Sequence, residues 1–225
     1  MPLISAIMPT YNRCPMLRNR LAELYAQTCQ DWELIIVNDC STDSTKGFLD
    51  ALDDPRIKVI HLEKNSGCVT IPRNIGITKA TGKFICPTDD DVENKPNKLK
   101  VLSDTLITYP KAILSYGDRE TERNGRIETI VLPNWNPFAG SGIDNGQIMY
   151  RNIYQSFPLL FCRRACDWEL AKQLRTKGPF IRVPEIVSKY IWHGANRSLD
   201  PSTKTRPMDI NYYNNYFNGY KQLIV

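Results

Sequence analysis

The chain has 225 residues, of which 42% are hydrophobic and 24% charged, a balance typical of globular proteins that excludes the disordered and fibrous classes. The formal net charge of +5 comes from Lys and Arg residues spread along the sequence, with no run of basic residues interleaved with aromatic ones. We therefore expect no nucleic-acid partner.

The N-terminal stretch predicts a strand rather than a targeting signal. Residues 3–8 are apolar, but no basic region precedes them and Pro9 interrupts the run. No segment approaches the ~20 apolar residues that a transmembrane helix needs. The seven cysteines are odd in number and scattered, which argues against a zinc site or a disulfide framework. These features predict a soluble protein with reduced thiols in the cytoplasm.

The first half of the chain alternates short apolar runs with amphipathic stretches, which is the pattern of βαβ units and a largely parallel sheet. The predicted strands are residues 3–8, 33–38, 57–62 and 84–88, and the predicted helices between them are residues 15–26, 44–52 and 69–80.

The pattern changes after Asp91. A helix is predicted at residues 96–109, followed by strands at 112–116 and 127–131 that flank the tight turn Asn124-Gly125. Residues 133–146 are rich in Pro, Gly and Asn and predict a long loop, where substrate-binding side chains often lie. The last predicted elements are a helix at residues 167–176 and a strand at 186–192.

Three adjacent carboxylates, Asp89, Asp90 and Asp91, directly follow the fourth predicted strand. In an extended segment Asp89 and Asp91 point the same way, because side chains alternate. Adjacent carboxylates repel each other, so they are most easily tolerated in solvent or around a cation. Their position at the carboxyl end of a strand suits Mn²⁺ or Mg²⁺ that bridges phosphates. The alternative is a solvated acidic turn before the next helix.

The first two predicted strands also end in polar residues. Pro9, Thr10, Tyr11 and Arg13 offer an aromatic ring and free backbone groups after the first strand, although an ordinary strand-to-helix turn explains the segment equally well. After the second strand, Asp39 is placed to accept hydrogen bonds from a nucleotide base or ribose, whereas a nearby second acid, Asp43, is typical of a helix N-cap.

Together these segments resemble glycosyltransferase family 2. The matching pieces are AIMPTYNR, QTCQDWELIIVNDCSTDST, NSGCVTIPRNIGITKATGKFI, TDDDV and CDWELAKQL, in the family's order and spanning most of the chain. The resemblance implies an α/β fold of the GT-A type, with a Rossmann-like, mostly parallel sheet flanked by helices. Within this single catalytic domain, residues 1–92 would form a nucleotide-binding half and residues 93–225 a smaller acceptor-binding half.

The resemblance also implies roles for the residues of the nucleotide-binding half. Asp91 would bind the metal, Mn²⁺ or Mg²⁺, and His193 resembles a late histidine near the metal or diphosphate, although core packing explains His193 equally well. His61 lies in a strand pattern and is interpreted as structural. The implied nucleotide-binding residues are Pro9, Thr10, Tyr11, Arg13, Asp39, Arg73, Asp89 and Asp90.

The segment CDWEL resembles the family motif that carries the catalytic base. Asp167 is the candidate base and Glu169 the reserve; on a helix they face different directions, so both cannot point into one site. Cys166 stands where the family usually has an acid, which puts the role of that acid in doubt. The alternative is that both acids occupy the first turn of a helix, where negative charge is favourable.

The implied reaction is a metal-dependent, inverting transfer of a sugar from a UDP-sugar to a hydroxyl of a carbohydrate or glycoconjugate acceptor. Two alternatives stay open, a noncatalytic module that binds nucleotide sugars or glycans and a sugar nucleotidyltransferase. The second would need a Gly-rich loop after the first strand, where PTYNRCPM has no glycine. Four residues of the long loop have side chains of the kind that contact sugars, with ordinary loop packing as the alternative for each: Asn134, Trp135, Asp144 and Asn145.

Overall fold

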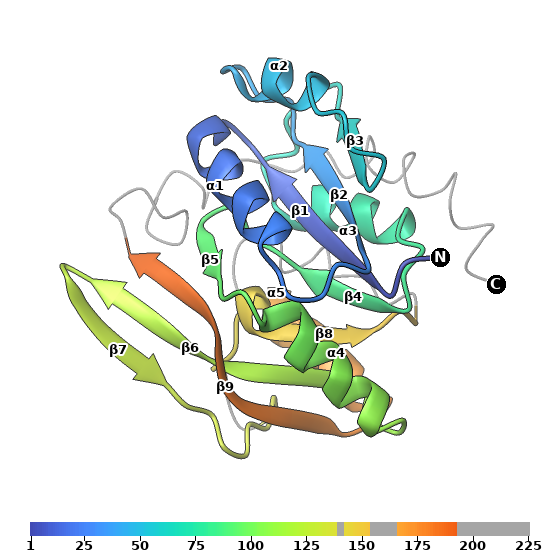
Figure 1. The fold of residues 1–225 in the computed structure, drawn as a ribbon, viewed down its shortest axis with the longest axis vertical. Helices are drawn as coiled ribbons and strands as arrows, with labels where there is room; N and C mark the ends of the chain where they lie inside the picture. The colour runs from blue at the N-terminus through green and yellow to red at the C-terminus, as the bar shows by residue number, and fades with distance from the viewer. Residues whose placement is uncertain (139–141, 154–165, 193–225) are drawn as a thin grey trace.

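A computed structural model describes residues 1–138, 142–153 and 166–192 (Figure 1). Within these residues, nine strands form one twisted sheet in the order β3-β2-β1-β4-β8-β6-β9-β5, and β7 pairs with β6. The strands are β1 (Ile4–Thr10), β2 (Trp32–Asn38), β3 (Ile57–His61), β4 (Phe84–Pro87), β5 (Val92–Asn94), β6 (Leu114–Arg123), β7 (Arg126–Ile130), β8 (Ile148–Arg151) and β9 (Phe180–Trp192). The helices are α1 (Cys14–Tyr25), α2 (Thr45–Asp50), α3 (Thr70–Thr78), α4 (Lys98–Thr108), α5 (Cys166–Arg175) and the short 3-10 helix η1 (Asn145–Gln147).

Strands β1 to β4 are parallel to one another, as the alternation of strand and helix predicts. The register pairs Ile4 with Trp32 and Thr10 with Asn38, so β1 and β2 end side by side. Because the carboxyl ends of parallel strands share one edge of the sheet, the polar segments that follow β1, β2 and β4 are brought together there.

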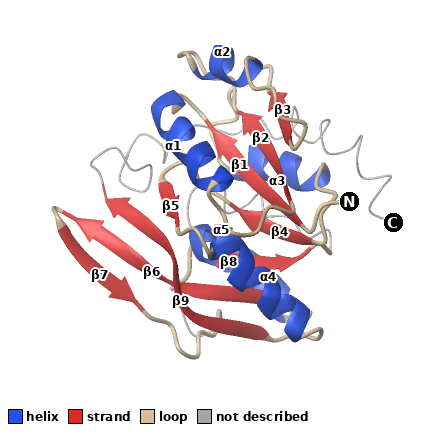
Figure 2. Ribbon diagram, in the orientation of Figure 1, coloured by secondary structure: helices blue, strands red, loops and turns tan. Residues whose placement is uncertain are grey.

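Helices cover both faces of the sheet, and each face has its own apolar core (Figure 2). On one face, Leu17 and Leu21 of α1 and Leu102 of α4 pack on the strands. On the other face, Ile75 of α3 and Leu170 of α5 do the same. The result is a three-layer α/β/α arrangement, which confirms the predicted α/β fold.

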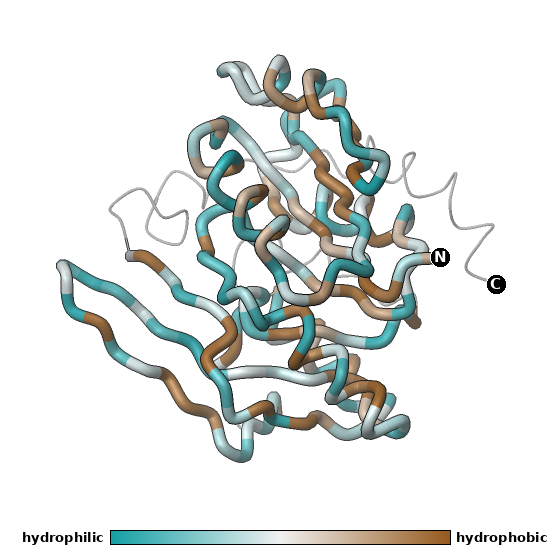
Figure 3. The backbone as a smooth tube through the Cα atoms, in the orientation of Figure 1, coloured by the Kyte–Doolittle hydropathy of each residue, from teal (hydrophilic) through white to brown (hydrophobic). Residues whose placement is uncertain are grey.

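The second half of the sheet departs from the predicted elements. The strands β5 and β8 were not predicted, and β6 and β9 are longer than expected. The three residues of β5 are too few to show the alternation of a strand. β9 contains charged side chains whose partners lie on β6: Arg182 pairs with Asp118, and Lys189 pairs with Glu122. The β6–β7 hairpin extends away from the helices, and β7 carries apolar segments at the edge of the molecule (Figure 3).

The cysteines differ from the expectation at one position. Cys68 is disulfide-bonded, whereas Cys14, Cys29, Cys40, Cys86 and Cys166 are free thiols. The expectation of reduced thiols throughout is therefore wrong at Cys68, because pairing depends on the approach of two Cβ atoms in the folded chain and not on sequence spacing. None of the described helices is both long and apolar enough to cross a bilayer.

A buried carboxylate near the amino ends of the strands makes stability depend on pH. Glu33 accepts hydrogen bonds from Ser5, Thr81 and Lys58 at 2.7 to 2.8 Å. Burial alone would raise its pKa, but these bonds lower the pKa to about 2. Since the folded-state pKa lies below the ordinary value of 4.5, the stabilisation is present above that value and is lost as the pH falls towards 2.

Unfolding midpoints measured from pH 7 to pH 2 should therefore fall less steeply in Glu33→Gln than in the native chain, with the exposed Glu128→Gln as the control.

Candidate functional site

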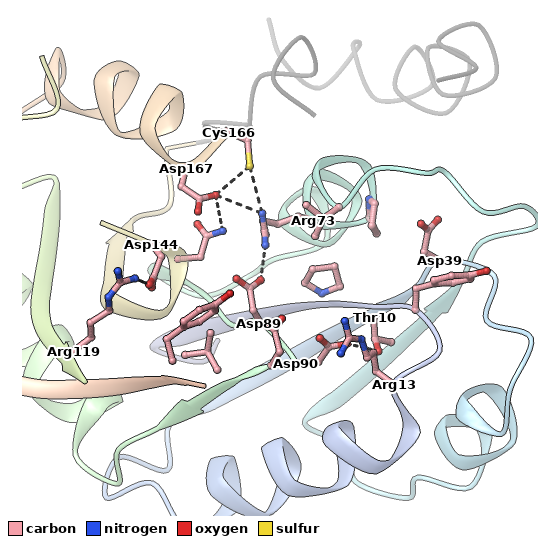
Figure 4. Close-up of a pocket in the computed structure, with 18 residues that line it drawn as sticks. Thr10, Arg13, Asp39, Arg73, Asp89, Asp90, Arg119, Asp144, Cys166 and Asp167 are labelled. Atoms are coloured by element: carbon pink, nitrogen blue, oxygen red, sulfur yellow. Dashed lines mark hydrogen bonds and ion pairs between the residues drawn. The ribbon is translucent and has the colours of Figure 1, made fainter. Parts of the chain in front are cut away.

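A cavity of about 360 Å³ opens at the edge of the sheet where β1, β2 and β4 end (Figure 4). The expected nucleotide-binding residues, Asp91 and the candidate base Asp167 all line it, as do Asp144 and Asn145, whereas Glu169, Asn134 and Trp135 do not. The lining residues are Pro9, Thr10, Tyr11, Arg13, Asp39, Val69, Pro72, Arg73, Asp89, Asp90, Asp91, Val92, Arg119, Asp144, Asn145, Cys166, Asp167 and Tyr190.

The loops after β1 and β2 are held together by side-chain hydrogen bonds. Asn12 and Cys40 adopt left-handed backbone conformations with φ of 53° and 57°, which turn the chain sharply after each strand. The Asn12 carboxamide oxygen accepts a hydrogen bond from the backbone N–H of Thr42 at 2.8 Å. The hydroxyl of Ser41 and its backbone N–H donate to Asn38 Oδ1. The two loops therefore form one wall of the cavity.

Asp39 is fixed within this wall. Its Oδ1 accepts a hydrogen bond from the backbone N–H of Ser66, and its Oδ2 accepts one from the Ser66 hydroxyl, both at 2.8 Å. The amide of Asn65 donates to Oδ2 at 3.3 Å. These hydrogen bonds hold the Asp39 carboxylate in place in the cavity wall.

The first two carboxylates of the acidic triplet contact different partners. Asp89 points to Arg73, and Asp90 points to the opposite side, where the Thr10 hydroxyl donates to its Oδ2 at 2.8 Å (Figure 4). Burial and the neighbouring charge of Asp91 raise the pKa of Asp90 to about 7. The third carboxylate, Asp91, also lines the cavity. Asp90 lies in a turn and is half-buried, so the acidic turn is not fully solvated at this residue.

Arg73 lies between two carboxylates that come from distant parts of the chain. Its guanidinium forms an ion pair with Asp89, and its Nη1 lies 3.8 Å from Asp167 Oδ1. The Arg73 side chain is only 2% exposed. Burial alone would lower its pKa, but Asp89, Cys166 and Asp167 keep that pKa above the ordinary value. Arg73 is therefore a buried permanent cation that joins α3, the end of β4 and α5.

The candidate base Asp167 lies at the start of α5. Burial raises its pKa above the ordinary value, against the opposing effect of the Arg73 charge. The adjacent Cys166 thiol lies 3.1 Å from Asp167 Oδ1, and burial raises its pKa to about 12, so the thiol is protonated and acts as a hydrogen-bond donor. The residue that replaces the family's usual acid is thus a neutral donor to the base.

Sequence reasoning missed part of the cavity wall. Arg119 of β6 and Tyr190 of β9 line the cavity, and the register of these parallel strands places Tyr190 opposite Thr121, on the same face as Arg119. Arg119 forms an ion pair with Asp144. No local motif marks Arg119 or Tyr190, because a parallel pairing between distant strands brings them together. Asp144 and Asn145, expected as sugar contacts by type, do line the cavity.

Glu169 is not part of this arrangement. Glu169 forms a salt bridge with Lys172 one turn along α5, at 2.8 Å, and is not among the residues that line the cavity. His193 lies outside the described residues. His61, interpreted as structural, contacts Asn38 and Asp50 at 2.9 Å each, outside the cavity. The cavity thus contains a single candidate for the base among the described residues of α5, Asp167.

Residues 5–170 match the family described as Glycosyl transferase family 2. The chain belongs to this family. The protein named putative colanic acid biosynthesis glycosyl transferase WcaA, of Escherichia coli K12, is 43% identical over 102 residues, which cover 44% of this chain and 36% of WcaA. A glycosyltransferase of Haemophilus influenzae is 27% identical over 251 residues, which cover 95% of this chain and 75% of the relative. The match to WcaA thus spans well under half of that relative's length.

Solved structures of family-like enzymes share the fold. TarS residues 1–349 of S. aureus, solved in complex with UDP-GlcNAc, superimposes with a TM-score of 0.71 at 20% identity, covering 93% of this chain and 63% of that one. The mannosyltransferase PcManGT of Pyrobaculum calidifontis, solved with GDP-Man and Mn²⁺, gives a TM-score of 0.62 at 18% identity, covering 84% of this chain and 56% of that one. These likenesses show that the α/β fold is of the GT-A type.

The acidic triplet fits a divalent cation that is shared with a substrate. Mg²⁺ and similar ions that bridge phosphates use one or two protein carboxylates and take their other ligands from phosphate and water. Asp89 is paired with Arg73, Asp90 accepts a hydrogen bond from Thr10, and Asp91 lines the cavity beside them. No cluster of three or more His, Cys, Asp or Glu side chains suited to a metal occurs among the described residues. The donor set therefore suits a cation that arrives with a diphosphate.

Proposed function

We propose that this chain is an inverting glycosyltransferase that moves a sugar from a nucleoside diphosphate, with UDP as the expected nucleotide, to a hydroxyl of a carbohydrate or glycoconjugate acceptor. The observation that carries the proposal is that Asp167 shares one cavity with Asp39 and the acidic triplet. A nucleotide-side wall and a candidate base thus face the same space. The TarS structures in complex with UDP and with UDP-GlcNAc favour UDP as the nucleotide.

In this proposal the walls of the cavity have separate tasks. Asp39 and Tyr11 hold the nucleoside, and Asp167 removes the proton from the acceptor hydroxyl as that oxygen attacks the anomeric carbon. The bond between the anomeric carbon and the diphosphate oxygen breaks in the same step, with inversion. A base must lie within hydrogen-bond reach of the nucleophile, so positioning of both substrates supplies much of the rate.

A Mn²⁺ or Mg²⁺ ion held by Asp91 would neutralise the negative charge that grows on the leaving diphosphate. Arg73 is committed to Asp89 and Asp167. We therefore infer that the role of Arg73 is to hold these two carboxylates in place.

Release of UDP from UDP-sugars tests the proposal. The purified chain is incubated with a panel of UDP- and GDP-sugars in Mn²⁺, with and without simple glycoside acceptors, and free nucleotide is measured. Turnover that depends on Mn²⁺ and increases with an acceptor supports a transferase. Binding detected by thermal shift, together with no nucleotide release, would instead support the noncatalytic module.

Replacement of Asp91 should separate metal-dependent binding from nucleoside binding. Asp91→Ala is expected to weaken the affinity for UDP in Mn²⁺ by about 10- to 100-fold, because one charge-assisted ligand of the cation is lost. UDP affinity in EDTA should change by less than about threefold. Calorimetric titration of both proteins with UDP, in Mn²⁺ and in EDTA, makes the comparison, and equal losses under both conditions would contradict the metal role.

A further inference from the structure

The contacts of Asp167 fall on one of its two carboxylate oxygens. Asn145 Nδ2 donates to Oδ1 at 2.8 Å, the Cys166 thiol lies 3.1 Å from Oδ1, and Arg73 Nη1 lies 3.8 Å from the same atom (Figure 4). None of these three contacts falls on Oδ2. The Asp167 side chain remains 27% exposed at the cavity wall, so the carboxylate is anchored through Oδ1 and is still accessible from the cavity.

The shortest of these contacts comes from a residue that is itself held rigidly. Asn145 is 1% exposed and begins the short helix η1. At the other end of η1, Gln147 Nε2 donates to the backbone carbonyl of Gly117 in β6 at 2.9 Å. The preceding Asp144 is paired with Arg119, also in β6. η1 is therefore fixed to β6 on both sides of Asn145.

Gly146 allows η1 to lie close against the sheet. A Cβ atom at this position would lie 2.7 Å from Val92 Cγ1 of β5, closer than real Cβ contacts allow. The 3-10 helix thus packs directly on the strand that follows the acidic triplet. This close packing fixes the distance from which the Asn145 amide reaches Asp167.

We propose that Asn145 is a positioning residue for Asp167: its amide holds Oδ1 so that Oδ2 faces the acceptor hydroxyl. The inference rests on the proposed function, because it assigns Asp167 as the base. It adds a residue from outside the recognised motifs, located in the loop between β7 and β8. Without this hydrogen bond, rotation of the carboxylate would present either oxygen to the acceptor, whereas proton removal needs only one of them.

The charges around Asp167 fix the direction of the pH effect. The groups that face it are Arg73 of α3, Asp89 after β4, Cys166 of α5 and the uncharged Asn145 of η1. Burial raises the pKa of Asp167, and the Asn145 hydrogen bond is one of the interactions that lower it. Loss of that bond raises the pKa further. Because a base acts in its ionised form, the rate increases with pH through this pKa, and the acid limb of the profile moves to higher pH.

The test compares three variants with the native chain. Asn145→Ala removes the donor, and the nearly isosteric Asn145→Asp replaces the donor with a second negative charge while keeping the shape. The control is Asn152→Ala, because the Asn152 amide donates to the carbonyl of Gly82 at 3.0 Å, at the amino end of β4 and away from the cavity. The dependence of kcat and KM on pH is measured with a UDP-sugar in Mn²⁺, and thermal unfolding is measured in parallel.

We expect kcat of Asn145→Ala to fall about 10- to 100-fold, as is typical when a hydrogen bond to a charged group is lost, with KM for the UDP-sugar changed by less than about threefold. The acid limb should move to higher pH in Asn145→Ala and further in Asn145→Asp, and Asn152→Ala should keep the native profile. An unchanged acid limb in both Asn145 variants would overturn the inference, even if their stability fell.

The failure of this inference is distinguishable from the failure of the proposed function. If Asp167→Asn is inactive while Asn145→Ala keeps the native rate and pH profile, only the role of Asn145 is wrong. If the native chain and Asp167→Asn are equally inert towards UDP-sugars in Mn²⁺, the proposed function and the positioning role fail together.

Discussion

Asp167→Asn is expected to lower the rate of sugar transfer by about 10²- to 10⁴-fold, the usual contribution of a general base. The amide has nearly the same shape as the carboxylate, but it cannot accept the proton of the acceptor hydroxyl. UDP affinity should change by less than about threefold, because Asp39 and the loops after β1 and β2 lie on another wall of the cavity. Single-turnover transfer assays and calorimetric titration with UDP measure the two effects separately.

The matched control for this prediction is Glu169→Gln. Glu169 lies on the same helix, and its carboxylate is paired with Lys172 and does not line the cavity. We expect its rate to stay within about threefold of the native rate, since a surface salt bridge contributes little. Near-normal turnover in Asp167→Asn, or a large loss in Glu169→Gln, would show that the base is assigned to the wrong residue.

Arg73→Gln is expected to lower both stability and activity. Removing one partner of a buried ion pair leaves uncompensated charges and typically costs about 3–5 kcal/mol. At roughly 2–4 °C for each kcal/mol in a protein of this size, the melting temperature should fall by about 6–20 °C. Thermal unfolding followed by circular dichroism measures the shift. The exposed Arg126→Gln on β7 is the control and should leave the melting temperature nearly unchanged.

A double variant distinguishes loss of charge balance from loss of packing. In Arg73→Gln combined with Asp89→Asn, the carboxylate paired with Arg73 is also neutralised, so part of the lost stability should return. If the two substitutions destabilise additively, the ion pair between Arg73 and Asp89 contributes little, and the prediction for Arg73 would have to rest on packing alone. Transfer activity should stay low in the double variant because Asp167 still lacks the neighbouring guanidinium of Arg73.

The sequence predicted the part of the protein that depends on local pattern. Apolar runs and turn residues located β1 to β4 and the helices between them, and the resemblance brought together Asp39, the acidic triplet and Asp167, which do line one cavity. These residues lie at strand ends or helix starts, where a change in pattern is visible in the sequence.

The rest depends on pairing between distant segments. β8 joins β4 to β6, and β9 runs parallel to β6 with a register shift between Gly117 and Arg119 that no periodicity predicts. Arg119 and Tyr190 reach the cavity only through this pairing. The contact from Asn145 to Asp167 likewise needs η1 to be fixed on β6 and β5, and the disulfide at Cys68 depends on the folded geometry in the same way.

The antiparallel joint between β4 and β8 has a consequence for recombining members of this family. Phe84 pairs with Arg151 and Ile85 with Tyr150, so backbone hydrogen bonds between β4 and β8 join the first part of the sheet to the second. A chimera that takes its C-terminal portion from a relative must preserve the pairing of β4 with β8, since a mismatched β8 would leave β4 as an open, aggregation-prone edge. If the crossover lies in the loop before α4, every strand keeps the sequence of one parent. β4 and β8 then come from different parents, and their side chains must still be compatible where the two strands pair.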